Sequence, residues 1–288
     1  MSPLPSGPLT GAVALVAATR RLAEAGVPDP GRDARRLFSH SLGVEPGRLT
    51  LVLPEPVDGE KLAVFEALIE RRCAREPVSH LTGSRAFYGR RFKVTRDVLD
   101  PRPETETRIE AALSEAFGHV LDLGTGSGCI LLTLLAEMPD ARGIGVDVSE
   151  AACAVARENA EALGLADRVH ISVSDWVSRV EGMFDLVVSN PPDIARAEMA
   201  DLAPEVRDWE PAGALTDGAD GLSCYRAILA GATEVLAPGG RLVMELGVGQ
   251  AEAVGSLAVA RGFAPIALIP DLDGRDRVIV LGLPQSGF

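Results

Sequence analysis

The sequence predicts an α/β protein with a doubly wound, mostly parallel sheet, preceded by a small all-helical domain. Three observations support this fold class. From residue 119 onward, apolar strand patterns alternate with helical patterns, which is typical of a parallel sheet covered by helices. The first 80 residues show helical spacing of their apolar residues instead. The length of 288 residues suits one large domain and one small one.

The N-terminal region, residues 1–80, is expected to form a compact domain of short helices. Thr10 is a candidate N-cap for the first helix and Gly26 is its candidate stop. Apolar residues recur at helical spacing in three segments: 9–26, 31–42 and 60–75. This domain could be a bare scaffold or a docking surface for a partner.

Residues 81–104 are expected to link the two domains. The segment RAFYGRRFKVTRDVLD alternates apolar and polar residues on both sides of Gly89, which suggests a β-hairpin. Pro101 and Pro103 then form a stiff turn that opens a helix, because proline is not tolerated inside a helix.

The remaining chain, residues 105–288, is expected to form the sheet. Its strands are predicted at 119–123, 143–147, 169–173, 184–189, 241–246 and 277–282. Its main helices are predicted at 127–138, 150–163, 222–236 and 249–261. Ligands of such sheets bind beyond the carboxyl ends of the strands, so the residues that follow the strands are the candidates for function.

Charge and composition limit the classes of partner. The chain has 28 basic and 41 acidic residues, and the resulting net charge of −13 falls entirely within residues 81–288. Because a wide nucleic-acid interface needs a basic surface, we expect no direct binding of nucleic acid, although a local basic patch between Arg85 and Arg96 remains open.

The chain shows neither a long apolar run nor a secretion signal, so we expect a cytoplasmic protein that does not bind membranes.

Cysteine and histidine do not point to a metal. The four cysteines and four histidines are scattered, and no two cysteines form a C-x-x-C pair. This spacing fits neither a zinc site nor a disulfide framework. We therefore expect no bound metal.

A glycine loop follows the first predicted strand of the sheet. Glycines allow the backbone to turn sharply and approach a ligand closely. A dinucleotide fold would place a third glycine at position 129, but Cys129 stands there and the pattern is G-x-G-x-G. This pattern resembles motif I of class I methyltransferases, which implies contact with S-adenosylmethionine by the loop residues Gly124, Thr125, Gly126, Ser127 and Gly128.

Acidic residues follow the next two strands. Asp147 and its neighbour Val148 end the second strand, and a carboxylate there can accept hydrogen bonds from ribose hydroxyls. Because NAD and S-adenosylmethionine share this ribose, Asp147 alone does not choose between them. Asp175 and Trp176 follow the third strand, at a position that flanks adenine in methyltransferases. The three strand ends together favour an S-adenosylmethionine site.

The fourth strand ends in Asn190, Pro191, Pro192 and Asp193. A rigid turn alone would explain the two prolines. However, an Asn/Asp-Pro-Pro-aromatic sequence at this place resembles methyltransferases that modify planar nitrogens. Such a nitrogen is a poor nucleophile because its lone pair is delocalised. Asn190 and the carbonyl group of Pro191 can accept hydrogen bonds from the NH₂ group, and this positioning lowers the barrier to transfer.

Nearly the whole chain resembles the family of peptide chain release factor glutamine N5-methyltransferases. The residues that carry this resemblance include Glu76-Pro77-Val78-Ser79-His80-Leu81-Thr82-Gly83, Asp100-Pro101-Arg102-Pro103-Glu104-Thr105-Glu106, the glycine loop, Ser189-Asn190-Pro191-Pro192, residues 205–211, Asp220-Gly221-Leu222, Tyr225-Arg226 and residues 271–278. The arginine-proline turn joined to Asn-Pro-Pro is specific to this family.

The resemblance implies a Rossmann-like class I methyltransferase that converts S-adenosyl-L-methionine to S-adenosyl-L-homocysteine. It implies cofactor contacts from the glycine loop, Asp147, Val148, Asp175, Trp176 and Asn190, catalytic roles for Asn190 and Pro191, and a substrate site formed by residues 190–193. It also implies that release factors are the protein substrates and that the N-terminal domain helps to bind them. We expect a monomer.

Asp193 departs from the family pattern, which places an aromatic residue there, usually tyrosine. An aspartate cannot pack beside the target amide as an aromatic ring does. It could weaken catalysis, shift the substrate, or be tolerated because Asn190 and the prolines do most of the positioning. A nucleic-acid N-methyltransferase and a cofactor-binding homologue with weakened or altered activity are therefore the alternative hypotheses.

Overall fold

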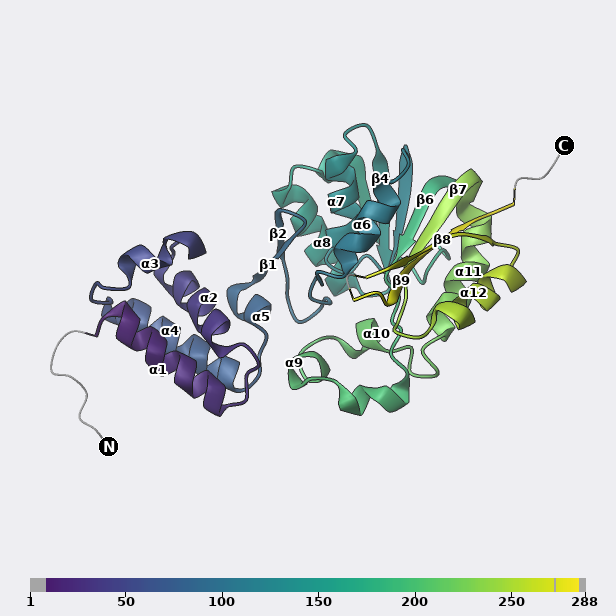
Figure 1. The fold of residues 1–288 in the computed structure, drawn as a ribbon. Helices are drawn as coiled ribbons and strands as arrows, with labels where there is room; N and C mark the ends of the chain where they lie inside the picture. The colour runs from purple at the N-terminus through teal and green to yellow at the C-terminus, as the bar shows by residue number, and fades with distance from the viewer. Residues whose placement is uncertain (1–8, 272, 285–288) are drawn as a thin grey trace. The chain divides into compact units, whose positions relative to one another are not determined.

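The protein is described by a computed structural model covering residues 9–271 and 273–284. Two compact units divide the chain, Met1–Gly83 and Ser84–Phe288 (Figure 1). Each has its own hydrophobic core.

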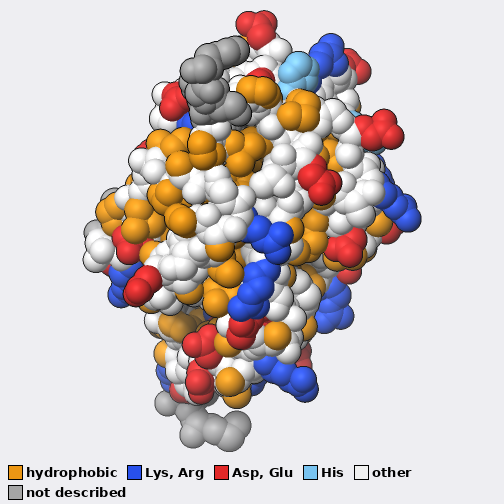
Figure 2. All heavy atoms as spheres, turned by 90° about the vertical axis from the view of Figure 1, so that its right-hand side faces the viewer, with side chains coloured by type: hydrophobic (Ala, Val, Ile, Leu, Met, Phe, Trp, Pro, Cys, Tyr) orange, Lys and Arg blue, Asp and Glu red, His pale blue; other side chains and the backbone are white. Residues whose placement is uncertain are grey.

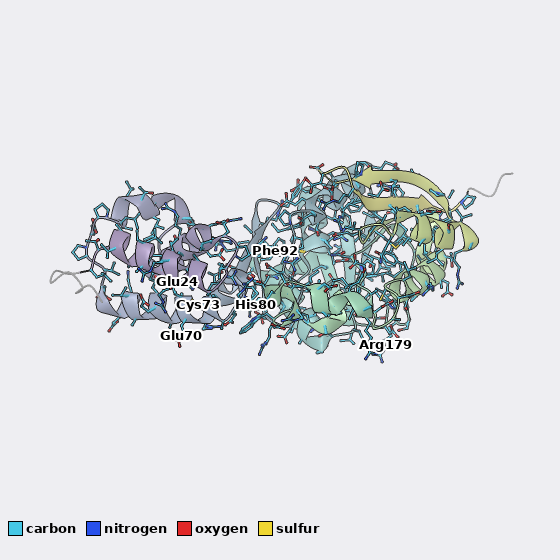
Figure 3. The ribbon with its side chains drawn as sticks, turned by 60° about the horizontal axis from the view of Figure 1, so that its bottom comes forward. Glu24, Glu70, Cys73, His80, Phe92 and Arg179 are labelled. Atoms are coloured by element: carbon cyan, nitrogen blue, oxygen red, sulfur yellow. The ribbon has the colours of Figure 1, made fainter. Side chains whose placement is uncertain are left out.

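The N-terminal unit is helical. Its helices are α1 (Gly11–Glu24), α2 (Pro30–Leu42), η1 (Pro46–Arg48), α3 (Leu49–Val52), α4 (Gly59–Cys73) and α5 (Val78–Thr82). The predicted cap is present, since the Thr10 side chain accepts a hydrogen bond from the Val13 amide. Gly26, the predicted stop, lies two residues after the end of α1 and has a left-handed backbone. Helices α1, α2 and α4 pack together around Phe38 and Phe65, whose ring centroids are 4.7 Å apart. Cys73 lies at the end of α4 (Figure 3).

A β-hairpin opens the second unit. Strands β1 (Ser84–Phe87) and β2 (Arg90–Lys93) pair antiparallel, as predicted, and Tyr88 and Gly89 form the turn between them. Both turn residues have positive φ, the geometry that matches the twist of a two-residue hairpin. Phe87 and Phe92 point into the core of this unit, where Phe92 is labelled in Figure 3.

The large sheet contains seven strands in the order β5-β4-β3-β6-β7-β9-β8. The strands are β3 (His119–Leu123), β4 (Arg142–Asp147), β5 (Val169–Val173), β6 (Phe184–Ser189), β7 (Leu236–Glu245), β8 (Ala264–Pro270) and β9 (Asp276–Gly282). The first five in this order run parallel, whereas β9 is antiparallel to both β7 and β8. The predicted doubly wound, mostly parallel sheet is confirmed.

Helices cover both faces of this sheet (Figure 1). One face is covered by α6 (Thr105–Leu113), α7 (Cys129–Glu137) and α8 (Glu150–Ala162), and the other by α11 (Ser223–Val235) and α12 (Ala251–Ala260). Successive residues of a strand face opposite layers: Val120 packs with the first group of helices and Leu121 with the second. Short helices η2 (Ala166–Arg168), η3 (Arg196–Asp201), α9 (Pro204–Arg207) and α10 (Ala212–Leu215) lie in the connections.

Two parts of the sheet differ from the sequence prediction. Strand β7 begins at Leu236, immediately after α11, and not at residue 241. The Pro-Gly-Gly segment lies inside the strand as an irregularity, where a side chain at Gly240 would come within 2.9 Å of the Phe184 carbonyl oxygen. Strand β8 was not predicted, because prolines near both of its ends obscured it; such residues are tolerated at a sheet edge.

Strand β8 and helix α12 also contribute apolar surface. Val259, Ile266 and Leu268 are exposed there, and the view of Figure 2 shows hydrophobic side chains among charged ones on this side of the molecule. Within residues 9–271 and 273–284, no helix combines the length and apolar character that crossing a bilayer requires.

Candidate active site

A cavity of about 390 Å³ lies where β3, β4, β5 and β6 end. These strands are parallel neighbours, so their carboxyl ends meet at one edge of the sheet. The volume falls in the range of small-molecule sites. Its lining residues all belong to the second unit: Asp97–Arg102, Thr105, Gly124–Ser127, Cys129, Ile130, Asp147–Ser149, Ala152, Ser174–Trp176, Asn190, Pro192, Pro211, Gly213, Ala214, Thr216, Asp217 and Cys224.

The glycine loop is held by its own backbone and by β4. The amides of Gly124 and Thr125 both donate to the Val146 carbonyl oxygen at 2.9 Å. Gly124, Gly126 and Gly128 all have positive φ, a conformation that glycine adopts without strain. A Cβ at Gly126 would meet no atom within 4 Å. This backbone therefore faces the open cavity and leaves room for a ligand.

Gly128 has a different place from the other loop glycines. It precedes α7, and a Cβ there would lie 3.1 Å from Leu132 and 3.2 Å from Ala156. Gly128 is buried and is not among the residues that line the cavity. It permits the loop and α7 to pack closely against α8.

The Asp147 carboxylate connects the glycine loop with the segment that follows β4. Its Oδ2 accepts a hydrogen bond from the Gly126 amide at 2.9 Å, and its Oδ1 accepts one from the Ser149 amide at 2.9 Å. These bonds hold the carboxylate at the cavity, where Val148 and Ser149 also lie. A ribose hydroxyl could donate to the remaining lone pairs of the carboxylate.

The segment after β5 places Asp175 and Trp176 at the cavity. Trp176 has φ of 47°, an unusual value for a residue with a side chain. Ser174 stabilises this turn, because its hydroxyl donates to the Trp176 carbonyl oxygen at 2.8 Å. The indole ring lies over Gly124, 3.8 Å from the position a Cβ would take. Trp176 thus forms an apolar wall beside the glycine loop.

The Asn-Pro-Pro-Asp turn after β6 is anchored by distant residues. The Ser189 hydroxyl donates to the Leu123 carbonyl oxygen at 2.7 Å, which ties the end of β6 to the start of the glycine loop. The Gln250 side chain donates to the Asp193 carbonyl oxygen at 2.8 Å. At Gly221, a Cβ would come within 2.4 Å of that same oxygen. The turn is therefore packed tightly against segments far away in sequence.

Asn190 and Pro192 line the cavity, whereas Pro191 is buried and Asp193 lies outside the lining. The Asp193 carboxylate approaches Gly247, where a Cβ would be 2.8 Å from Oδ2. Burial and the nearby Glu245 raise the pKa of Asp193 to about 6, while Arg277 acts against this rise. The Asp193 carboxylate is thus directed toward the residues that follow β7, and its assignment to the substrate site stays a prediction.

Two further segments line the cavity that the sequence did not assign to the cofactor. They are residues 97–102, which precede α6, and residues 211–217, which surround α10. An ion pair joins the two segments, since Arg102 Nη2 donates a hydrogen bond to Glu210 Oε1 at 2.6 Å. Their motifs were visible in the sequence, but a pair separated by 108 positions gave no signal that they meet.

The charge of the cavity favours a cationic ligand. Of the described residues that line it, five are aspartates and one is an arginine, Arg102. An anionic pyrophosphate would be repelled here, whereas a sulfonium would be attracted. The buried Ser127 hydroxyl also lines the cavity and makes no hydrogen bond to a described protein atom. The site therefore fits S-adenosylmethionine better than a dinucleotide, the choice that Asp147 alone leaves open.

The arrangement of the side chains gives no support for a metal centre. Among the residues that the structure describes, no group of three or more His, Cys, Asp or Glu side chains is arranged to hold an ion. All four cysteines are free thiols. Burial raises the pKa of Cys129 to about 12, so this thiol stays protonated and unreactive at neutral pH.

The sheet and the four strand-end segments define a class I, S-adenosylmethionine-dependent methyltransferase. Family models agree: the PrmC N-terminal domain matches residues 14–83 and the Methyltransferase small domain matches residues 105–204. The chain belongs to the release factor glutamine methyltransferase family.

Curated relatives resemble the chain over nearly its full length. A release factor glutamine methyltransferase from Cereibacter sphaeroides is 57% identical over 95% of this chain and 98% of its own length. One from Rhodospirillum rubrum is 47% identical over 93% of this chain and 83% of its own length.

Solved structures share the fold at low identity. A methyltransferase from Pyrococcus furiosus has a TM-score of 0.53 and 17% identity, covering 75% of this chain and 96% of its own. The hMettl16 catalytic domain, solved with an RNA hairpin, has a TM-score of 0.54 and 14% identity, covering 68% of this chain and 77% of its own. These likenesses concern the fold alone.

Proposed function

We propose that this protein transfers a methyl group from S-adenosylmethionine to the side-chain nitrogen of the glutamine in the Gly-Gly-Gln motif of peptide chain release factors. The observation that carries the proposal is the position of Asn190. This residue follows β6 and lines the same cavity as Asp147 and the glycine loop. A glutamine amide held by Asn190 would therefore lie beside the cofactor site. Membership of the family supports the choice of substrate.

The residues that would hold the cofactor divide by chemistry. The backbone at Gly124 and Gly126 leaves room for it, Asp147 would accept hydrogen bonds from its ribose, and Asp175 and Trp176 would border its adenine. When bound, the cofactor supplies a methyl group on a positively charged sulfur. The acidic lining of the cavity stabilises that positive charge before transfer.

The protein's part in the transfer is to orient the acceptor. The Asn190 side-chain oxygen and the Pro191 carbonyl oxygen accept hydrogen bonds from the glutamine NH₂ group and direct its lone pair at the methyl carbon. With the cofactor bound, the methyl carbon–sulfur bond would break as the carbon–nitrogen bond forms, and S-adenosylhomocysteine would be the leaving group. The nitrogen then loses a proton, which becomes acidic only after alkylation, so no strong base is required beforehand.

Asp193 alters the outer side of this acceptor site. An aromatic ring at that position could pack against the glutamine, but the Asp193 side chain is directed toward Gly247 and its backbone is fixed by Gln250. We propose that Asn190 and the two prolines do most of the positioning here. On this basis the protein is an active methyltransferase, and a tyrosine at this position would improve transfer only modestly.

Recognition of the whole release factor is assigned to the N-terminal unit. Its surface exposes Val13, Val16 and Val64 on α1 and α4, apolar side chains that a protein partner could cover. We further propose that the enzyme acts in the cytoplasm, where translation terminates, and that it acts as a monomer without binding nucleic acid directly.

A methyl-transfer assay tests the proposed function. Purified protein, S-adenosylmethionine and a recombinant release factor should yield one added methyl group, located by mass spectrometry on the Gly-Gly-Gln glutamine. The matched control is a release factor with that glutamine changed to alanine, which should gain nothing. Methylation of the alanine control, or labelling of bulk RNA in place of the release factor, would refute the proposal. Asp193→Tyr, assayed in parallel, shows whether the aspartate limits the rate.

A further inference from the structure

Arg108 is a buried cation with no place in the cavity. It lies on α6, has 0% exposure and is among the largest fully buried side chains. Its Nη1 donates to the Ser189 carbonyl oxygen at 2.8 Å and lies 3.5 Å from Glu245 Oε2. Burying a guanidinium is costly unless it is paired. A side chain retained at that cost calls for a role.

The first contact of Arg108 fixes the peptide bond from which Asn190 projects. The Ser189 carbonyl group belongs to the Ser189–Asn190 peptide, so the guanidinium restrains the orientation of that peptide plane. The Ser189 hydroxyl is held separately by the Leu123 carbonyl oxygen. The residue immediately before Asn190 is thus fixed by both its backbone and its side chain.

The positive charge of Arg108 also acts, without a direct contact, on a residue that holds the glycine loop. Asp122 is buried and its Oδ2 accepts a hydrogen bond from Thr125 of the glycine loop at 2.7 Å. The positive charge of Arg108 favours the ionised form of Asp122, which burial disfavours. Arg108 therefore fixes the Asn190 turn through its hydrogen bond to Ser189, while the hydrogen bond between Thr125 and Asp122 holds the glycine loop.

Glu245 completes the brace from the neighbouring strand. Its Oε2 accepts a hydrogen bond from the Thr105 hydroxyl at 3.0 Å and faces Arg108. The brace, defined as Arg108, Ser189 and Glu245, connects α6 with β6 and β7.

We infer that Arg108 is a positioning residue, which sets Asn190 relative to the cofactor loop without touching either substrate. This inference rests on the proposed function. It predicts that loss of the guanidinium reduces the rate of transfer more than it reduces binding, because small misplacements of reacting groups cost rate steeply.

Two variants test this inference. Arg108→Lys keeps the charge but loses the planar fork. The double variant Arg108→Leu, Glu245→Gln removes both buried charges together, which is often tolerated by folding. We expect kcat to fall about 10- to 100-fold in the double variant, and less in Arg108→Lys. The KM for the release factor and the Kd for S-adenosylmethionine should change by less than about threefold.

Arg241 provides a matched control. It is also a buried arginine, and its guanidinium donates to the carbonyl oxygens of Ala111, Ala112 and Glu115, near the opposite ends of the parallel strands. Arg241→Lys should lower stability without a selective loss of kcat. If kcat of both Arg108 variants stays within about twofold of wild type, the inference is wrong.

Hydrogen exchange separates this inference from the proposed function. The amides of Ser189, Asn190, Asp193 and Ile194 should exchange faster in Arg108→Lys than in wild type, while those of α12 should not change. Uniformly faster exchange would indicate a merely structural role and overturn the inference. Exchange does not require turnover, so a wild-type protein inactive on release factors would refute the proposed function while leaving this measurement valid.

Discussion

The glycine loop and the Asn-Pro-Pro-Asp turn, which follow the neighbouring strands β3 and β6, are held in different ways. The glycine loop is fixed largely by nearby atoms, because its amides bond to Val146 and to Asp147 on the adjacent strand. The Asn-Pro-Pro-Asp turn is fixed by residues from distant segments, among them Arg108 and Gln250. A local loop can be recognised from its own sequence. A turn that is held by residues distant in sequence cannot be recognised in this way, because its supporting residues lie outside its own motif.

Among the variants that test this comparison, we expect Asp147→Ala to have the largest effect, a loss of cofactor affinity. In Asp147→Ala, the Gly126 and Ser149 amides lose their acceptor, and so does the cofactor ribose. Hydrogen bonds to a charged group contribute about 1.5 to 3 kcal/mol each, so the Kd for S-adenosylmethionine should rise at least 10-fold. Calorimetry measures this change. Asp140→Ala, an exposed aspartate before β4, serves as the control and should bind normally.

Gly128 tests whether the glycine loop also depends on packing. Gly128→Ala should destabilise the fold by about 2 to 3 kcal/mol, because it combines left-handed strain with crowding against Leu132 and Ala156. Gly126→Ala carries the strain alone, since its Cβ would meet no atom, and should cost about 1 to 2 kcal/mol. Urea unfolding compares the two. Equal losses would show that packing at Gly128 contributes nothing.

Gln250 tests the remote support of the Asn-Pro-Pro-Asp turn. Gln250→Leu removes the donor to the Asp193 carbonyl oxygen, a bond whose net contribution is about 1 kcal/mol. We expect kcat to fall about fivefold while cofactor affinity stays unchanged. Glu252→Gln, an exposed change on the same helix, is the matched control. A loss of cofactor affinity in Gln250→Leu, with kcat preserved, would contradict the division between the two loops.

The smallest expected effect is the pH dependence at Asp193. Its pKa rises from 3.8 to about 6 on folding, so the folded protein holds this proton more tightly than the unfolded chain does. Stability from Asp193 is therefore fully present below pH 4 and is lost as the pH rises through about 6. Asp193→Asn should be more stable than wild type at pH 8, by on the order of 1 kcal/mol after solvent screening.

Thermal unfolding at pH 8 and at pH 5 measures the difference between Asp193→Asn and wild type. Glu245, Arg277 and Glu198 face the same carboxylate and are present in both proteins, so they cancel in the comparison. A stability difference that does not shrink at pH 5 would show that the aspartate is not the titrating group.

The sequence predicted most of the fold because apolar patterns record burial directly. Strands β3, β5 and β6 were predicted with their observed bounds. Strand β8 was missed because its burial is weak and prolines interrupt it. The first residues of β7 were missed; within them Gly240 permits a close approach to β6.

The site was predicted in part for the same reason. Residues that follow strands could be assigned, and Asp147, Trp176 and Asn190 all line the cavity. Residues 97–102 and 211–217 were not assigned, because their place at the cavity depends on an ion pair between Arg102 and Glu210. The brace around Arg108 joins positions more than 80 residues apart, a relation that one sequence does not reveal.

Strand β8 has a consequence for how the protein behaves at high concentration. It is an edge strand of the large sheet, and its side chains are apolar. Pro265 and Pro270 lack the N–H group that an added strand would need as a donor. Two of its seven positions thus cannot continue the ladder into a second molecule. Replacing these prolines would leave an uncharged edge strand that could pair with strands of other molecules and promote aggregation.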